Sequence, residues 1–137
     1  MRDTRAIINA LPFVIHHGIE VLRADETGAL VRMPYDPKFG TPPDMYPTAM
    51  VGMVGDVAAI SACFAVVPEG YACATLDFTV KNTGMAAGDE LVAEGRVLMA
   101  GKTVSVGAAD VFVVSNGERR PCGTVLATAR VYKVKGA

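Results

Sequence analysis

The sequence contains no tryptophan, two histidines and three cysteines among its 137 residues. Cys63, Cys73 and Cys122 are widely spaced and form no C-x-x-C pair, so they match neither a disulfide framework nor a zinc motif, and a reducing cytoplasm is the expected location. His16 and His17 lie in a β-like run, where adjacent side chains point to opposite faces. This scarcity argues against a metal site and against a Ser-His-Asp triad.

The sequence also lacks an excess of either charge, because 13 basic and 14 acidic residues give a formal net charge of -1. This balance gives no reason to expect nucleic acid or an anionic membrane as a partner. No secretory signal is predicted, since Pro12 interrupts the apolar start and no A-x-A site follows. Apolar residues form 51% of the chain, enough for one hydrophobic core, so we predict a single domain over residues 1–137.

One long apolar run, residues 46–68, contains a single charged side chain, that of Asp56. The run is long enough to cross a membrane. A central Asp, however, costs about 2.5 to 3.5 kcal/mol on insertion scales, and basic flanks are missing. We interpret the run as a buried helix over residues 47–66, with Pro47 in its first turn and Pro68 beyond its end. Such a helix needs cover on nearly all sides.

The other segments predict a short helix over residues 3–10, ended by Pro12, and six strands. Turns are expected at DETG, AGKT and SNGE. One antiparallel sheet can cover the long helix by curling around it. The strands are expected within residues 13–24, 28–35, 71–82, 89–115 (folded back at AGKT) and 121–134, with possible bends or bulges at Gly18, Gly95 and Gly107. A stripe of small helix residues, which allows close approach of another backbone, comprises Thr48, Gly52, Gly55 and Ala59.

Four segments carry a resemblance to a known family: PFVIHHGIEVLRADETGALVRMPYDP, TAMVGMVGDVAAISA, CATLDFTV and AAGDELVAEGRVLMAGKT. They are similar, in this order, to the opening strands, the helix, the next strand and the G-D-x-L-x-A-x-G-x-V strand of the hot-dog thioesterase superfamily. The PaaI-type (phenylacetyl-CoA thioesterase-like) branch is the most similar. The resemblance covers nearly the whole chain and implies an α+β hot-dog fold, in which a curled six-stranded antiparallel sheet wraps a long central helix.

The resemblance also implies hydrolysis of a small or medium acyl-CoA thioester. Asp56 matches the family's catalytic carboxylate, which acts as general base or nucleophile. Thr75 matches a Ser or Thr that helps hold the attacking water, and Lys102 matches a basic hairpin residue near the CoA phosphates. Backbone N–H groups at the helix start, those of Thr48 and Ala49, would stabilise the oxyanion.

Substrate binding is assigned to the same part of the chain. Tyr46, which precedes the helix, is expected to contribute, and soft apolar helix residues are expected to line the acyl pocket: Met50, Met53, Val54 and Phe64. The family has a His-Gly-Gly motif at the position where this chain has Pro47-Thr48-Ala49. A non-catalytic module that binds acyl-CoA or another small ligand is therefore the alternative function. A hot-dog dehydratase fits less well, because its Asp and His pair is absent.

Several of these residues also have an ordinary structural interpretation. Asp56 can be a hydrogen-bonded core or interface carboxylate, and Lys102 a solvated turn residue. Strict alternation places Thr75 on the face opposite Phe78 and Val80; if those two cover the helix, Thr75 points away from the Asp56 of its own chain. The resemblance implies a homodimer or homotetramer with sites assembled from two chains, and no cofactor beyond the coenzyme A of the substrate.

Overall fold

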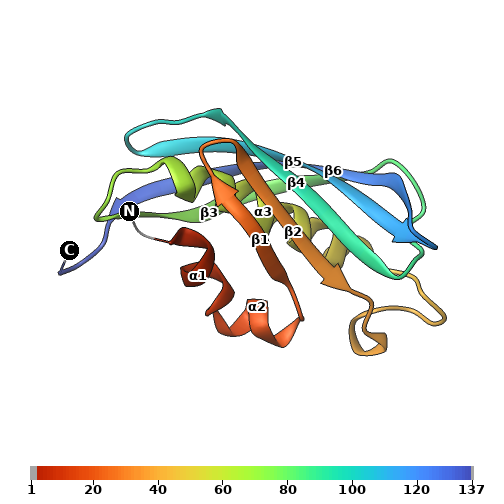
Figure 1. Ribbon diagram of the computed structural model, residues 1–137. Coiled ribbons are helices and arrows are strands. Elements are labelled where there is room, and N and C mark those ends of the chain that lie inside the picture. Colours follow the sequence, from red (N-terminus) through yellow and green to blue (C-terminus); the bar gives the residue numbers. More distant parts are fainter. Residues whose placement is uncertain (1–2, 137) are drawn as a thin grey trace.

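The chain folds as a six-stranded antiparallel sheet arched around one long helix, in a computed structural model that describes residues 3–136 (Figure 1). The helices are α1 (Thr4–Asn9), α2 (Pro12–His16) and α3 (Thr48–Val66), and a short 3-10 helix, η1, covers Pro37–Phe39. The strands are β1 (Glu20–Asp25), β2 (Gly28–Pro34), β3 (Tyr71–Asn82), β4 (Glu90–Met99), β5 (Val104–Ser115) and β6 (Glu118–Lys133).

The strands follow the order β1-β2-β4-β5-β6-β3, and each neighbouring pair is antiparallel. α3 packs against the concave face and contacts all six strands. The predicted fold class, a long central helix wrapped by a curled six-stranded sheet, is confirmed. The expected turns at DETG and SNGE close the β1–β2 and β5–β6 hairpins, and the 89–115 segment folds back beyond Met99 as predicted.

Close approach of α3 to the sheet depends on missing side chains. A Cβ on Gly95 of β4 would collide with the carbonyl oxygen of Ala58, and one on Gly107 of β5 would lie 2.8 Å from the carbonyl oxygen of Ala59. Neither glycine is a bulge, because the β4–β5 irregularity lies between Val97 and Met99. These glycines therefore admit the helix backbone, a role that the prediction of bends had not given them.

Among residues 3–136, only α3 is long and apolar enough to cross a membrane, and 61% of that stretch is buried inside the protein. The buried helix of a globular core meets the same two criteria. Here the sheet supplies the apolar surroundings, so the length and hydropathy of α3 follow from its place in the core.

The N-terminal segment differs from the prediction. α1 forms as expected, with the Asp3 carboxylate accepting a hydrogen bond from the Ala6 N–H at 3.1 Å. Pro12, however, begins a second helix, α2, where a strand was expected from residue 13. Proline suits the first turn of a helix, because the N–H that it lacks has no helical partner there. The strand starts only at Glu20, after Gly18 with φ 69°.

The two histidines consequently do not point to opposite faces of a strand, and that prediction was wrong. His16 ends α2 and His17 follows it. Their rings meet edge to face with centroids 5.1 Å apart, and both also contact the ring of Phe39. They join the N-terminal segment to η1.

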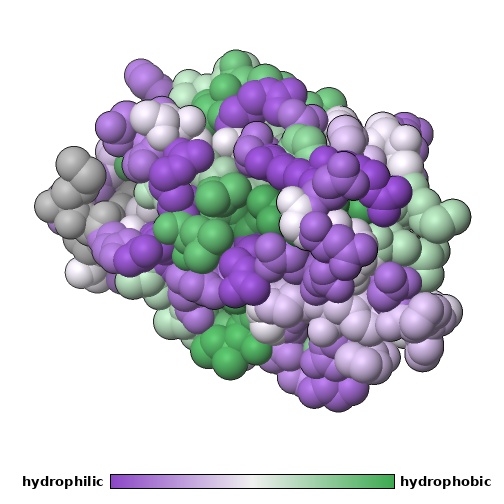
Figure 2. Space-filling model, turned by 45° about the vertical axis from the view of Figure 1, so that its right-hand side comes forward, coloured by the Kyte–Doolittle hydropathy of each residue, from purple (hydrophilic) through white to green (hydrophobic). Residues whose placement is uncertain are grey.

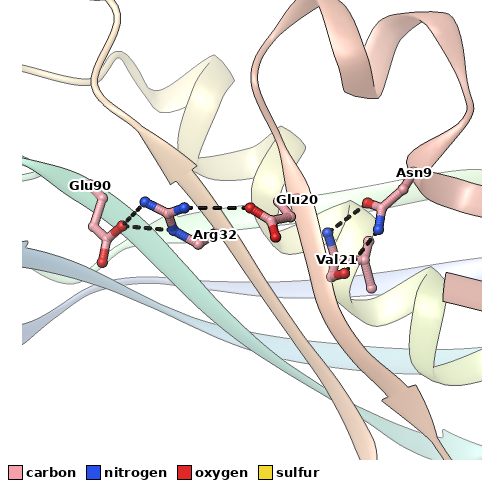
Figure 3. A network of polar contacts seen from close by, with 5 residues as sticks. All are labelled: Asn9, Glu20, Val21, Arg32 and Glu90. Atoms are coloured by element: carbon pink, nitrogen blue, oxygen red, sulfur yellow. Dashed lines mark hydrogen bonds and ion pairs between the residues drawn. The ribbon is translucent and has the colours of Figure 1, made fainter. Parts of the chain in front are cut away.

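Polar contacts hold this segment on the sheet edge (Figure 3). The side-chain amide of Asn9 donates to the Val21 carbonyl at 3.0 Å and accepts from the Val21 N–H at 2.8 Å, so it mimics a neighbouring strand along β1. Beside it, Arg32 of β2 bridges Glu90 at 2.9 Å and Glu20 at 3.4 Å. The Asn9 pair covers part of the β1 edge and fixes where α1 lies.

Candidate active site

A pocket of about 560 Å³ opens beside the middle of α3. One wall is α3, another is the first half of β3, and the third is the N-terminal segment. The lining residues from these walls include Asp56, Ile60, Ser61 and Phe64 of α3, Tyr71–Thr75 of β3, and Ile7, Ile8, Leu11 and Phe13. Apart from a few polar groups the wall is apolar, which suits a hydrocarbon ligand held by a small number of directed contacts.

Asp56 is the ionisable group of this pocket that lies on α3. Its carboxylate is partly buried, and burial raises its pKa above the ordinary value of 3.8. A hydrogen bond from Thr75 partly opposes this effect, because it favours the ionised form. Thr75 Oγ1 donates to Asp56 Oδ1 at 2.9 Å. The result is a carboxylate whose pKa is shifted toward neutrality, as general-base chemistry requires.

The expectation that Thr75 points away from Asp56 was wrong. The β3–β6 register pairs Thr75 with Ala129 and Asp77 with Thr128, so Leu76 is an extra residue in β3. This bulge changes which alternate residues face α3. Thr75, which precedes the bulge, faces α3, and so does Phe78, which follows it. Leu76, the bulged residue, is 58% exposed.

The other residues predicted for the site lie elsewhere in the same chain. Thr48 and Ala49 occupy the first turn of α3, where the Thr48 hydroxyl accepts from Asn82 at 2.6 Å. Tyr46 is a core residue that donates to the Met33 carbonyl at 3.4 Å, and burial raises the pKa of its hydroxyl. None of these three lines the Asp56 pocket.

Of the four residues predicted to line the acyl pocket, one lines the Asp56 pocket of this chain, and the role of the other three stays a prediction. Phe64 does line the pocket, whereas Met50, Met53 and Val54 belong to or pack against the core. Lys102 lines a second pocket of about 420 Å³, formed by the end of α3 and the β4–β5 hairpin. Tyr71 borders both pockets.

Sequence reasoning missed two parts of the site. The first is the N-terminal segment, whose exposed apolar side chains near the pocket include Ile7, Leu11 and Phe13. The expected strand had placed Phe13 in the sheet. The second is Ser61, a polar residue five positions after Asp56, whose isolation in an apolar helix was the available signal.

Figure 2 shows that apolar side chains gather in separate patches between hydrophilic ones on the face that it presents.

Within residues 3–136, no three His, Cys, Asp or Glu side chains come together in a way that could hold a metal ion. The side chains with polar or ionisable groups among the pocket's lining residues are those of Asp56, Ser61, Glu69, Tyr71, Cys73, Thr75 and Tyr132.

Three solved structures of similar fold come from bacteria. A thioesterase family protein from Silicibacter pomeroyi is 24% identical, with a TM-score of 0.87 and 96% of each chain covered. A thioesterase from Haemophilus influenzae is 18% identical, with a TM-score of 0.82 and coverage of 94% of this chain and 88% of that one. A Bacillus halodurans protein solved with CoA is 19% identical, with a TM-score of 0.67 over 74% of this chain and 70% of its own.

No family model and no curated protein matches the sequence. The structural likeness nevertheless confirms the expected fold: the chain has the hot-dog fold of thioesterase-superfamily proteins. The PaaI-type branch stays a prediction.

Proposed function

We propose that the protein hydrolyses the thioester of a small or medium acyl-CoA, with Asp56 as general base or nucleophile. One observation carries this proposal: a partly buried carboxylate, with a pKa raised by burial, lies in a largely apolar pocket and is oriented by a hydroxyl. The charge and the orientation of the Asp56 carboxylate suit attack on an acyl carbon, while the apolar walls of the pocket suit the acyl chain.

Thr75 is proposed to hold both the carboxylate and the attacking water. Its hydroxyl donates its proton to Asp56 and keeps oxygen lone pairs that can accept a hydrogen bond from water. A water beside both groups would lose a proton to Asp56 as it attacks the thioester carbon. The C–S bond would then break, protonated Asp56 would pass its proton to the leaving sulfur, and coenzyme A would leave as the thiol, with no further cofactor.

The remaining site residues are proposed to come from a second copy of the chain. β3 ends the sheet and spans twelve residues, so it offers a long edge for pairing. In such a homodimer, or a tetramer built from it, the helix start of one subunit would complete the pocket of the other. Thr48 and Ala49 would donate to the oxyanion, Tyr46 and Met53 would border the substrate, and Lys102 would lie near the CoA phosphates. The proposed location is the cytoplasm.

The altered helix start favours one alternative, a module that binds acyl-CoA without cleaving it. Pro47 is the residue before α3 and has no N–H to offer. Ala49 adds a side chain where the related motif has glycine. Both changes reduce access of a thioester oxygen to the backbone donors.

Turnover of a panel of acyl-CoAs, measured as release of the CoA thiol, separates the two functions. Wild-type protein should hydrolyse at least one member, and Asp56→Ala and Asp56→Asn should lower kcat by about 100-fold or more, the size of effect expected for a general base. Asp77→Asn is the matched control, because Asp77 lies exposed on the same strand as Thr75. Binding without turnover, unaffected by Asp56→Ala, would establish the module instead.

A further inference from the structure

Ser61 has an unsatisfied hydroxyl in the wall of the candidate active site. The side chain is fully buried and lines the same pocket as Asp56. Across residues 3–136, the buried side-chain atoms without a hydrogen-bond partner are Ser61 Oγ and Tyr35 Oη, and Tyr35 lines neither pocket. Burying a hydroxyl without a partner costs free energy, so such a group inside a pocket points to a ligand that supplies the partner.

Helix geometry places this hydroxyl at a definite distance from the reacting group. Ser61 lies five positions after Asp56, which is about 7.5 Å along the helix axis and about 140° around it. Between them, Val57 and Ile60 line the same wall, and Phe64 follows beyond. Ser61 therefore supplies a polar group beyond an apolar stretch of the wall. Ile8 and Leu11 of the N-terminal segment are among the other lining residues.

We propose that Ser61 selects acyl groups that carry a hydroxyl or keto oxygen toward their distal end. The inference rests on the proposed function, because it places the thioester at Asp56. An extended chain advances about 1.2 Å per bond, so an oxygen near Ser61 lies at least about six bonds beyond the thioester carbon. A hydroxyl close to the thioester would stay beside Asp56, whereas a distal one would reach Ser61 Oγ.

Binding measurements test this selection without any need for turnover. The ligands are S-(2-oxoalkyl)-CoA thioethers, which lack a cleavable thioester, made in hexanoyl-like, ω-hydroxyhexanoyl-like and β-hydroxyhexanoyl-like forms. Calorimetry on wild-type protein should give an ω-hydroxy ligand that binds about tenfold more tightly than the unsubstituted one, which is about 1.4 kcal/mol. The β-hydroxy ligand should show no such advantage.

The variant Ser61→Ala should abolish the tenfold difference between the ω-hydroxy and unsubstituted ligands. Without ligand, Ser61→Ala should also raise the melting temperature, because it removes an unpaired buried hydroxyl. Ser105→Ala is the matched control and should not raise it, since the equally buried Ser105 accepts from the Gly101 N–H at 3.3 Å.

Equal binding of the ω-hydroxy and unsubstituted ligands to wild type, or a preference that survives Ser61→Ala, would overturn the role of Ser61. Failure of the proposed hydrolysis gives a different result, namely ligand binding with the expected preference but no CoA release from the corresponding thioesters.

Discussion

Thr75 donates a hydrogen bond of 2.9 Å to Oδ1 of Asp56, across the gap between β3 and α3. The contact exists because the bulge at Leu76 turns Thr75 toward the helix. Burial raises the pKa of Asp56 while this bond lowers it, so the two residues together set the pH at which the carboxylate becomes a base.

Thr75→Val should move the acidic limb of the pH–kcat/KM profile to higher pH. Without the hydroxyl, the protonated form of Asp56 is favoured further, so its pKa rises and a higher pH is needed to ionise it. The profile is measured on the best acyl-CoA substrate of the panel. Thr79→Val, at an exposed position of the same strand, should leave the limb in place. A shift of the Thr75→Val limb to lower pH would contradict the assignment.

Asp56→Asn should stabilise the protein at neutral pH. Because the native pKa lies above the unfolded value near 3.8, the native state binds more protons between these two values. Stability therefore falls as pH rises through that window, and the cost remains at higher pH. Urea unfolding between pH 4 and 8 should show a wild-type slope that Asp56→Asn lacks. An Asp56→Asn slope equal to the wild-type slope would show that burial does not set the pKa of Asp56.

Asn9→Ala should destabilise the protein by about 1 to 3 kcal/mol, the worth of two hydrogen bonds whose backbone partners are left on β1. It should also raise KM for acyl-CoA, because Ile7 and Ile8 line the pocket from the helix that Asn9 anchors. Asn9→Asp keeps the acceptor for the Val21 N–H, so its free energy of unfolding in urea should fall between those of wild type and Asn9→Ala. An Asn9→Ala protein with wild-type stability would mean that the N-terminal segment is held by packing alone.

Gly95→Ala should destabilise the fold more than Gly52→Ala. The new Cβ of Gly95 would meet the backbone of Ala58, which cannot move without displacing α3, whereas that of Gly52 would lie 2.9 Å from the ring of Phe78. Phe78 is 42% exposed and its ring can shift. Overpacking of this kind lowers the free energy of unfolding by about 1 to 3 kcal/mol. Thermal unfolding of Gly95→Ala should show a loss at or above the upper end of this range. The reverse order would show that the sheet moves more easily than the ring.

Local patterns in the sequence were sufficient for the elements that they fully specify. The long helix was expected over residues 47–66 and runs over Thr48–Val66, because prolines bound a continuous apolar run. The hairpin turns were equally clear. The N-terminal segment was not, since Pro12 can end one helix or begin the next and only packing on the β1 edge selects between them.

The sequence by itself determined the fold class and singled out Asp56, since a lone carboxylate in an apolar helix is visible in the order of residues. Only the tertiary structure decided which groups meet it. Strict alternation along β3 predicted that Thr75 points away from Asp56. In the structure a single bulged residue, whose position depends on pairing with β6, makes Thr75 face Asp56. Ser61 likewise became notable only once the residue was seen to line the pocket and its buried hydroxyl to have no partner. Contacts between distant segments depend on register and packing, which no local pattern encodes.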